Sequence, residues 1–408
     1  MAKSSISMPP PSTIDAWRRR IREDAISNYH LEMGLALERV GDAESALTAY
    51  RRASQARSDM VEAVYLEEQL TRKLSRSSEA NALARQAHAI DPNYMGTAPF
   101  RLALTAIERG EAKRAHDWFQ SSHEAGHDDA IVGLVAAMLA MGEREKAMEL
   151  AELSPILTGT AAEVLGNTII RETLRWMSET WGWPQVYLPT LRLASRLQPD
   201  DPDILNHYGR ILLTCLETSE SEAIFADLTQ REISSSAIVD AWCFVGLARA
   251  AAQQPGEALD AFSEALRRDP ESLMAHACRA NLLMILGRLA EADAPLAQSL
   301  RLAPDNPALH AYTLRRRGLV DGMDTILSEH VELAHQFPAD MGVQLGLAFC
   351  ASVAEQDDIA IQAMRTALTG RRDQFWLNIV LSPEWRSRLL NLCRRVQIPE
   401  PLALGKLL

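Results

Sequence analysis

VDAWCFVGLARAAAQQPGEALDAFSEALRRDPESLMAHACRANLLMILGRLAEADAPLAQSLRLAPDN, residues 239–306, contains one pattern of residues twice. In each copy, two apolar segments with helical spacing flank a short polar stretch, which predicts two helices joined by a turn. The matched pairs are separated by one constant interval (280 − 246 = 34), and they are Gly246 and Ala280, Ala258 and Ala292, and Pro270 and Pro304. The stretch therefore predicts two consecutive helix–turn–helix units of equal length.

Packing explains why these residue types recur. Gly246 or Ala280 must be small because the first helix of a unit crosses the second closely there. Phe262 is expected to fill the space between the helices, which contributes roughly 1.5–3 kcal/mol on burial. Pro270 ends the second helix, since the residue before a proline disfavours the α region. One such helix pair cannot bury its own apolar face, so the pattern predicts neighbouring units.

The spacing resembles the tetratricopeptide repeat (TPR) family, whose pattern is W-x2-L-G-x2-Y, then A-x3-F, then P, with a period of about 34 residues. About ten such units fit between residues 27 and 374. The resemblance implies an all-α fold, a right-handed α-solenoid (superhelix) of helix–turn–helix repeats with N- and C-terminal capping helices. We refer to the first and second helix of each pair as helix A and helix B.

The remaining sequence is divided by its composition and by slips in the period. We expect a disordered N-terminus, an N-terminal helix, about four repeats, an insertion, about six repeats and a C-terminal capping segment. The corresponding ranges are 1–11, 12–26, 27–155, 156–167, 168–374 and 375–408.

The TPR resemblance also implies a binding groove, because in that family the A helices line a concave surface that usually holds a peptide or a partner helix. The groove candidates carried over are Glu172, Trp176, Asn206, His207, Arg210, Leu247, Asn281, Tyr312 and Arg315. Trp176 belongs to a cluster with Trp181 and Trp183. Such a cluster either packs between repeats or anchors a partner, since tryptophan is enriched at binding hot spots.

Charge and composition exclude several classes of protein. The 42 basic and 54 acidic residues give a net charge of −12, which argues against nucleic acid as the main partner because phosphate contacts dominate that binding. The N-terminus lacks the apolar region of a secretory signal, and no run of eighteen apolar residues suggests a membrane span. Five scattered cysteines, with no C-x-x-C pair, fit a reducing compartment. We therefore expect a cytoplasmic protein.

One motif favours a different chemistry. His123-Glu124-Ala125-Gly126-His127 matches H-E-x-x-H, in which two histidines on one helix face bind zinc and the glutamate acts as a general base. The repeat pattern, however, predicts that the helix ends near Ala125, with Gly126 as its C-terminal glycine. His127 is then expected to lie beyond the helix, away from the face that carries His123.

Together these observations favour a non-enzymatic scaffold or adaptor that binds a protein or peptide partner in its concave groove. A regulatory sensor that closes on a short peptide or small ligand is the alternative, and a zinc metalloenzyme using His123 and His127 is a second one. We expect no catalytic residue, no metal and no cofactor. The sequence does not specify the oligomeric state.

Overall fold

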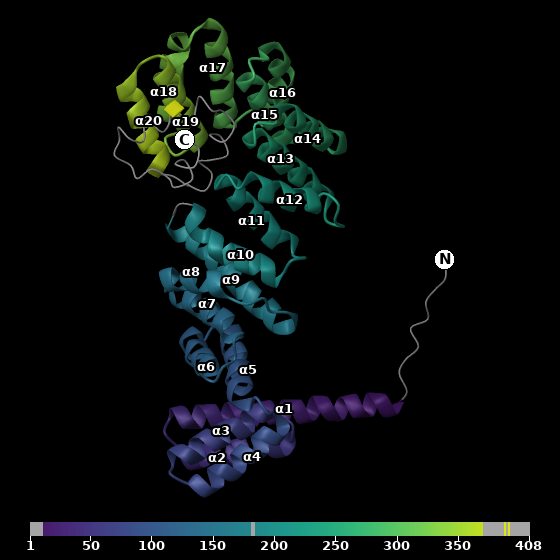
Figure 1. Ribbon diagram of the computed structural model, residues 1–408. Coiled ribbons are helices and arrows are strands. Elements are labelled where there is room, and N and C mark those ends of the chain that lie inside the picture. The colour runs from purple at the N-terminus through teal and green to yellow at the C-terminus, as the bar shows by residue number, and fades with distance from the viewer. Residues whose placement is uncertain (1–10, 181–183, 370–386, 389–390, 392–408) are drawn as a thin grey trace. The chain divides into compact units, whose positions relative to one another are not determined.

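The computed structural model describes residues 11–180, 184–369, 387, 388 and 391, and every regular element within these ranges is helical. Within them, twenty α-helices follow one another in chain order and form ten A/B pairs (Figure 1). The fold is therefore an all-α array of TPR-type helix pairs. None of the described helices combines the length and the apolar composition needed to cross a membrane.

The chain divides into two compact units, residues 1–157 and 158–408. The helices of unit 1 are α1 (Pro11–Arg39), α2 (Ala43–Ala56), α3 (Val61–Lys73), α4 (Ser77–Ile90), α5 (Tyr94–Glu108), α6 (Ala112–Glu124), α7 (Ala130–Met141) and α8 (Arg144–Leu153).

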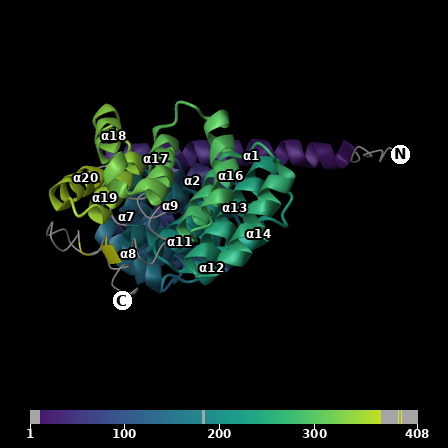
Figure 2. The same ribbon diagram turned by 90° about the horizontal axis from the view of Figure 1, so that it is seen from above.

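Unit 2 begins with a long helix and contains one short 3-10 turn, Pro184–Tyr187. From α9 to α20, each helix of this unit packs against the next one in the chain, and Figure 2 shows α17 to α20 grouped together. The helices are α9 (Gly159–Thr180), α10 (Leu188–Leu197), α11 (Pro202–Thr214), α12 (Thr218–Leu228), α13 (Ser235–Ala251), α14 (Pro255–Arg268), α15 (Leu273–Ile285), α16 (Leu289–Leu302), α17 (Pro307–Asp321), α18 (Met323–Gln336), α19 (Met341–Val353) and α20 (Asp357–Thr369).

A glycine on helix A and an aromatic ring on helix B form the contact that holds several pairs together. A β-carbon added to Gly246 would overlap the ring of Phe262, which lies sixteen positions later (262 − 246 = 16) and is fully buried. The same spacing joins Gly34 to Tyr50 in α1 and α2. The predicted close crossing at Gly246 is therefore present in the structure.

The second pair, α3 and α4, reverses this arrangement. Glu68 stands one repeat after Gly34, at the small-residue position, and Ala84 stands one repeat after Tyr50. Glu68 is only 1% exposed, and its Oε1 accepts a hydrogen bond from Arg72 Nε at 2.8 Å. The large side chain is now on helix A and the small one on helix B. This exchange explains how a repeat with a weak sequence match still packs.

Two expected boundaries differ in the structure. Helix α1 runs without a break through residue 26, so the expected N-terminal helix and the first helix A are one helix. Residues 159–166, expected within an insertion, form the first two turns of α9. Gln198 stabilises these turns, because its Nε2 donates to the Glu163 carbonyl at 3.1 Å and to Asn167 Oδ1 at 3.0 Å. The expected disordered segment, apart from Pro11, and nearly all of the C-terminal capping segment lie outside the described residues.

Candidate functional site: a groove on three A helices

One candidate site is a groove of about 520 Å³ formed by α13, α15 and α17, the A helices of three consecutive pairs. Asp240, Met274 and Ala308 occupy one repeat position, each one period after the last, and all three line the groove. The repeat period therefore places one side chain from each helix in a row along this surface.

The polar lining of the groove is acidic. Asp240, Asp269 and Glu271 line it, and no lysine, arginine or histidine is among its described lining residues. Partial burial raises the pKa of Asp240, while the nearby Arg210 guanidinium opposes part of this rise. Glu271 also pairs with Arg301 at 3.2 Å between two exposed side chains, an arrangement that contributes little. The groove thus has negative charge along its lining.

The remainder of the lining is mainly apolar. Val239 and Leu309 are buried beneath the surface, whereas Leu273, Met274 and Tyr312 are half-buried and reach the groove. Burial raises the pKa of Tyr312 to about 12, so its hydroxyl stays protonated near neutral pH. A polarisable methionine beside a tyrosine provides an adaptable apolar surface for a partner side chain.

A second row lies deeper, and it contains three of the groove residues expected from the sequence. Leu247, Asn281, Arg315 and Phe349 follow one another at intervals of one repeat. Arg315 Nη1 donates to Asn281 Oδ1 at 2.9 Å, and its Cζ lies 5.1 Å from the centre of the Phe349 ring. Arg315 and Asn281 are 7% and 3% exposed. Both side chains bind the neighbouring repeat, so they hold the array together instead of facing a partner.

The expected residues on α11 lie at the edge of this region. Asn206, His207 and Arg210 are all half-buried. The Arg210 guanidinium lies 5.5 Å from the centre of the Phe244 ring, a cation–π contact with the next helix A. Burial lowers the pKa of His207, and the adjacent Arg210 charge acts in the same direction. Arg210 thus borders Asp240 without lining the groove.

The residues expected on α9 do not join the groove. Trp176 is 8% exposed and packs edge-on against Tyr187, with ring centres 4.8 Å apart. Glu172 is 7% exposed and pairs with Arg171 at 3.0 Å and Arg175 at 2.8 Å. Packing against the Pro184–Tyr187 turn accounts for Trp176, which agrees with the first of the two alternatives that the sequence left open for the tryptophan cluster. Trp181 and Trp183 lie outside the described residues.

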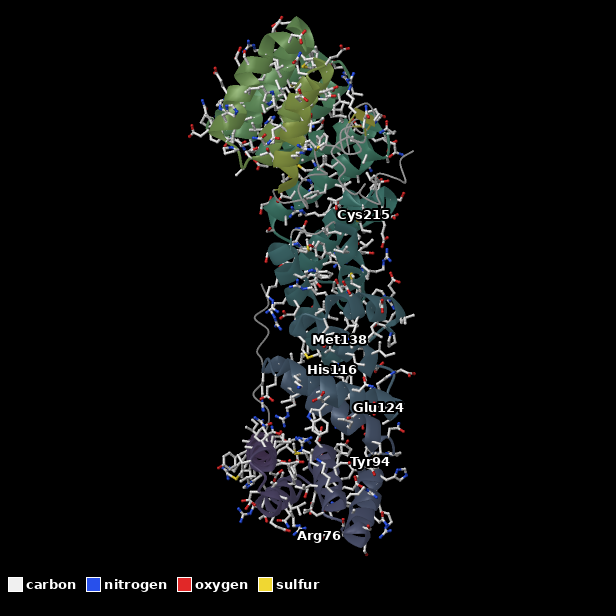
Figure 3. The ribbon with its side chains drawn as sticks, turned by 90° about the vertical axis from the view of Figure 1, so that its left-hand side faces the viewer. Arg76, Tyr94, His116, Glu124, Met138 and Cys215 are labelled. Atoms are coloured by element: carbon white, nitrogen blue, oxygen red, sulfur yellow. The ribbon has the colours of Figure 1, made fainter. Side chains whose placement is uncertain are left out.

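The H-E-x-x-H segment does not form the helical zinc site. Helix α6 ends at Glu124, and Gly126 follows in the left-handed region with φ +85°. His123 is exposed, whereas His127 lies beyond the helix and stacks on Phe100 with ring centres 4.7 Å apart. Glu124, at the end of α6 in Figure 3, is exposed and accepts from Gln120 Nε2 at 2.9 Å. In the part of the chain that the structure describes, no group of three His, Cys, Asp or Glu side chains is placed to hold a metal ion.

Purified protein is accordingly expected to contain no stoichiometric zinc. Because His123 is exposed, His123→Ala should change the free energy of unfolding by no more than about 0.5 kcal/mol. Elemental analysis by mass spectrometry and urea denaturation, with and without added zinc, measure both quantities. One tightly bound zinc ion per chain that disappears in His123→Ala would contradict this geometry.

Asp240, Met274 and Ala308 are not among the groove residues expected from the sequence. The repeat period nevertheless places these three residues at one position of successive A helices. These residues lie one helical turn before Phe244, Cys278 and Tyr312, and the last of these was among the candidates. The period shows that the row exists. Only the packing shows that it is more accessible than the deeper row.

Comparisons with known proteins give similarities of fold type alone. No protein-family model matches the sequence, and no curated protein matches it. YrrB, a solved TPR protein, is 18% identical, with 47% of this chain and 94% of that chain covered at a TM-score of 0.31. Yeast Tom70 is 14% identical, and the match covers 92% of this chain and 85% of Tom70 at a TM-score of 0.32. Human IFIT1 is 14% identical, and the match covers 85% of this chain and 86% of IFIT1 at a TM-score of 0.38. The description of the fold therefore rests on the helix pairs of this chain and their constant period.

Proposed function

We propose that this chain is a protein-interaction scaffold whose groove on α13, α15 and α17 binds a peptide segment carrying a lysine or arginine beside an apolar side chain. The observation that supports this proposal most directly is the groove itself. It joins an apolar floor to three carboxylates, and its described lining contains no basic residue.

The two parts of the lining have different roles in binding. Burial of apolar surface against Leu273, Met274 and Tyr312 supplies most of the affinity, at roughly 25 cal/mol per Å² removed from water. Exposed carboxylates contribute less affinity, but they select the sign of the partner's charge and increase its association rate. Acidic segments are disfavoured because they bring like charges together.

The row also gives the bound segment a direction. Asp240, Met274 and Ala308 present a carboxylate, a thioether and a methyl group on three successive A helices. We therefore place the cationic side chain of the segment near Asp240 and its apolar side chain over Met274. Alternating contacts of this kind are how extended peptides are recognised when their side chains enter separate pockets.

The Asp240→Lys/Glu271→Lys variant is expected to lose binding of a basic-apolar peptide by at least about tenfold, because two attractive charges become repulsive. The probes are two fluorescent ten-residue peptides, one with lysines flanking a central leucine and the other with glutamates in place of the lysines. Fluorescence anisotropy at low and physiological salt measures the affinity, and the lysine peptide should bind better.

Glu257→Lys/Asp260→Lys is the matched control. It changes the net charge equally on α14, a helix B whose residues do not line the groove, so binding should be retained. Equal binding of the two peptides by the wild-type chain would refute the proposed charge preference. A similar loss in both variants would assign the effect to net charge and not to the groove.

A further inference from the structure

Unit 1 contains a cavity of about 280 Å³ that is lined by residues of α1, α3 and α5, the A helices of the first three pairs. Its apolar wall consists of Leu31 from α1, Met60 just before α3 and Leu102 from α5, and all three are buried. Its polar lining includes Glu62 of α3 and Arg101 of α5. The cavity therefore places two opposite charges beside an apolar surface.

Glu62 is a buried carboxylate with too few hydrogen-bond donors. It is 8% exposed, its Oε2 makes no hydrogen bond within the described residues, and its Oε1 lies 3.4 Å from Arg101 Nη1. Glu68 of the same helix is satisfied at both oxygens, by Arg72 at 2.8 Å and by Gln69 at 2.7 Å. Because buried polar groups in native proteins are nearly always paired, the Glu62 carboxylate has room for a further donor.

Arg101 is the counterpart of Glu62, and its donors are also largely unused. Its 3.4 Å contact with Glu62 is longer than the roughly 2.7–2.9 Å of a strong charge-assisted hydrogen bond. In the part of the chain that the structure describes, its guanidinium makes no other hydrogen bond. The side chain is 55% exposed, so it is able to turn toward a ligand without disturbing the core.

The other charged side chains of the lining are already engaged. Glu32 and Arg109 pair with each other at 2.5 Å, and Arg57 pairs with two aspartates at 3.1 Å each. Glu62 and Arg101 are therefore the charged pair of the described lining that retains capacity for a ligand.

We infer that this cavity binds a free α-amino acid with an aliphatic side chain. Such a molecule carries an ammonium and a carboxylate on one carbon atom, which matches two opposite protein charges 3.4 Å apart. Its ammonium donates to the Glu62 carboxylate, and its carboxylate accepts from the remaining N–H groups of Arg101, whose fork suits a carboxylate. Its side chain packs on the apolar wall. This inference does not rest on the groove of α13, α15 and α17.

Size and charge favour a small zwitterion over other ligands. The volume of about 280 Å³ is just below the range of roughly 300–1,000 Å³ that holds drug-sized ligands. It equals the volume of roughly nine water molecules, which suits a molecule of about ten non-hydrogen atoms. A simple cation would meet Arg101 and a simple anion would meet Glu62. A zwitterion satisfies both groups and adds no net charge to the site.

Isothermal titration calorimetry of the full chain tests the ligand class with three probes. They are L-leucine, L-leucinamide, which lacks the carboxylate, and 4-methylpentanoate, which lacks the ammonium. We expect leucine to bind at least about tenfold more tightly than either analogue, because each analogue loses one charged contact. No binding of leucine at about 10 mM would overturn the inference and leave water as the partner of Glu62. Equal binding of leucine and leucinamide would also overturn it.

Two variants and their controls test the site. Glu62→Gln and Arg101→Gln should each weaken leucine binding at least about tenfold. Glu67→Gln changes a carboxylate that is 3% exposed on α3, and Arg85→Gln changes an exposed arginine on α4. Neither residue lines the cavity, so both controls should bind leucine as the wild type does. Urea denaturation verifies folding, and the exposed Arg101 decides the outcome if Glu62→Gln is too unstable to assay. Wild-type affinity in Arg101→Gln, or an equal loss in Arg85→Gln, would overturn the site.

Discussion

The His330→Leu variant should be more stable than the wild type at acidic pH and should lose much of the wild type's sensitivity to acid. His330 is completely buried in α18, at the repeat position that Phe262 and Leu296 occupy in the two preceding pairs. Neither ring nitrogen makes a hydrogen bond of ordinary geometry within the described residues. Burial lowers the pKa of His330 to about 4, and the Val343 backbone opposes only part of this shift.

The lowered pKa determines the sign of the pH effect. The folded chain keeps His330 neutral down to pH about 4, whereas the unfolded chain takes up a proton near pH 6.5. The unfolded state therefore binds more protons between these values, and stability falls as the pH decreases from about 6.5 to about 4. A difference of about 2.5 units corresponds to about 3 kcal/mol for this residue.

Urea denaturation at pH 7 and pH 4.5 measures the effect. The free energy of unfolding should fall less between the two pH values in His330→Leu than in the wild type. His310→Leu is the control, because His310 is exposed, with its Nε2 2.7 Å from the Pro304 carbonyl oxygen. If the wild type and His330→Leu lose stability equally on acidification, His330 is not the buried group that senses acid.

The Gly246→Leu variant is expected to lose about 1–3 kcal/mol of stability through overpacking. Any β-carbon at this position overlaps the Phe262 ring, and that ring is fully buried against neighbouring helices, so it cannot move aside easily. The loss should appear as a lower urea midpoint for unfolding of unit 2.

Gly256→Leu is the comparison for Gly246→Leu. Gly256 is also helical, but no atom lies within 4 Å of the place where its β-carbon would be. Leucine has a better helix propensity than glycine, so this variant should be neutral or slightly stabilising. Equal effects at the two glycines would show that the close crossing of α13 and α14 is not at Gly246.

The sequence by itself determined the repeating architecture. A constant repeat period, with a small residue such as Gly246 and an aromatic one such as Phe262 sixteen positions later, defines a helix pair that needs neighbours. The end of α6 was likewise predictable, because Gly126 adopts a left-handed conformation that glycine tolerates best. Both features depend on residues that are close in the sequence, so the number of residues between them determines which side chains are in contact.

Tertiary structure decided which polar residues line the groove and which ones bind the neighbouring repeat. The period places Asn281 and Arg315 at one repeat position, but only packing shows that they bond to each other and that Arg315 lies against Phe349. A polar side chain on helix A faces the next repeat when the residue one period away offers it a hydrogen bond. When that residue offers none, the polar side chain stays in water and faces the groove. Packing outside the helix also buries Trp176 against Tyr187 and leaves Tyr29 exposed, although Trp176 and Tyr29 are both aromatic residues on A helices.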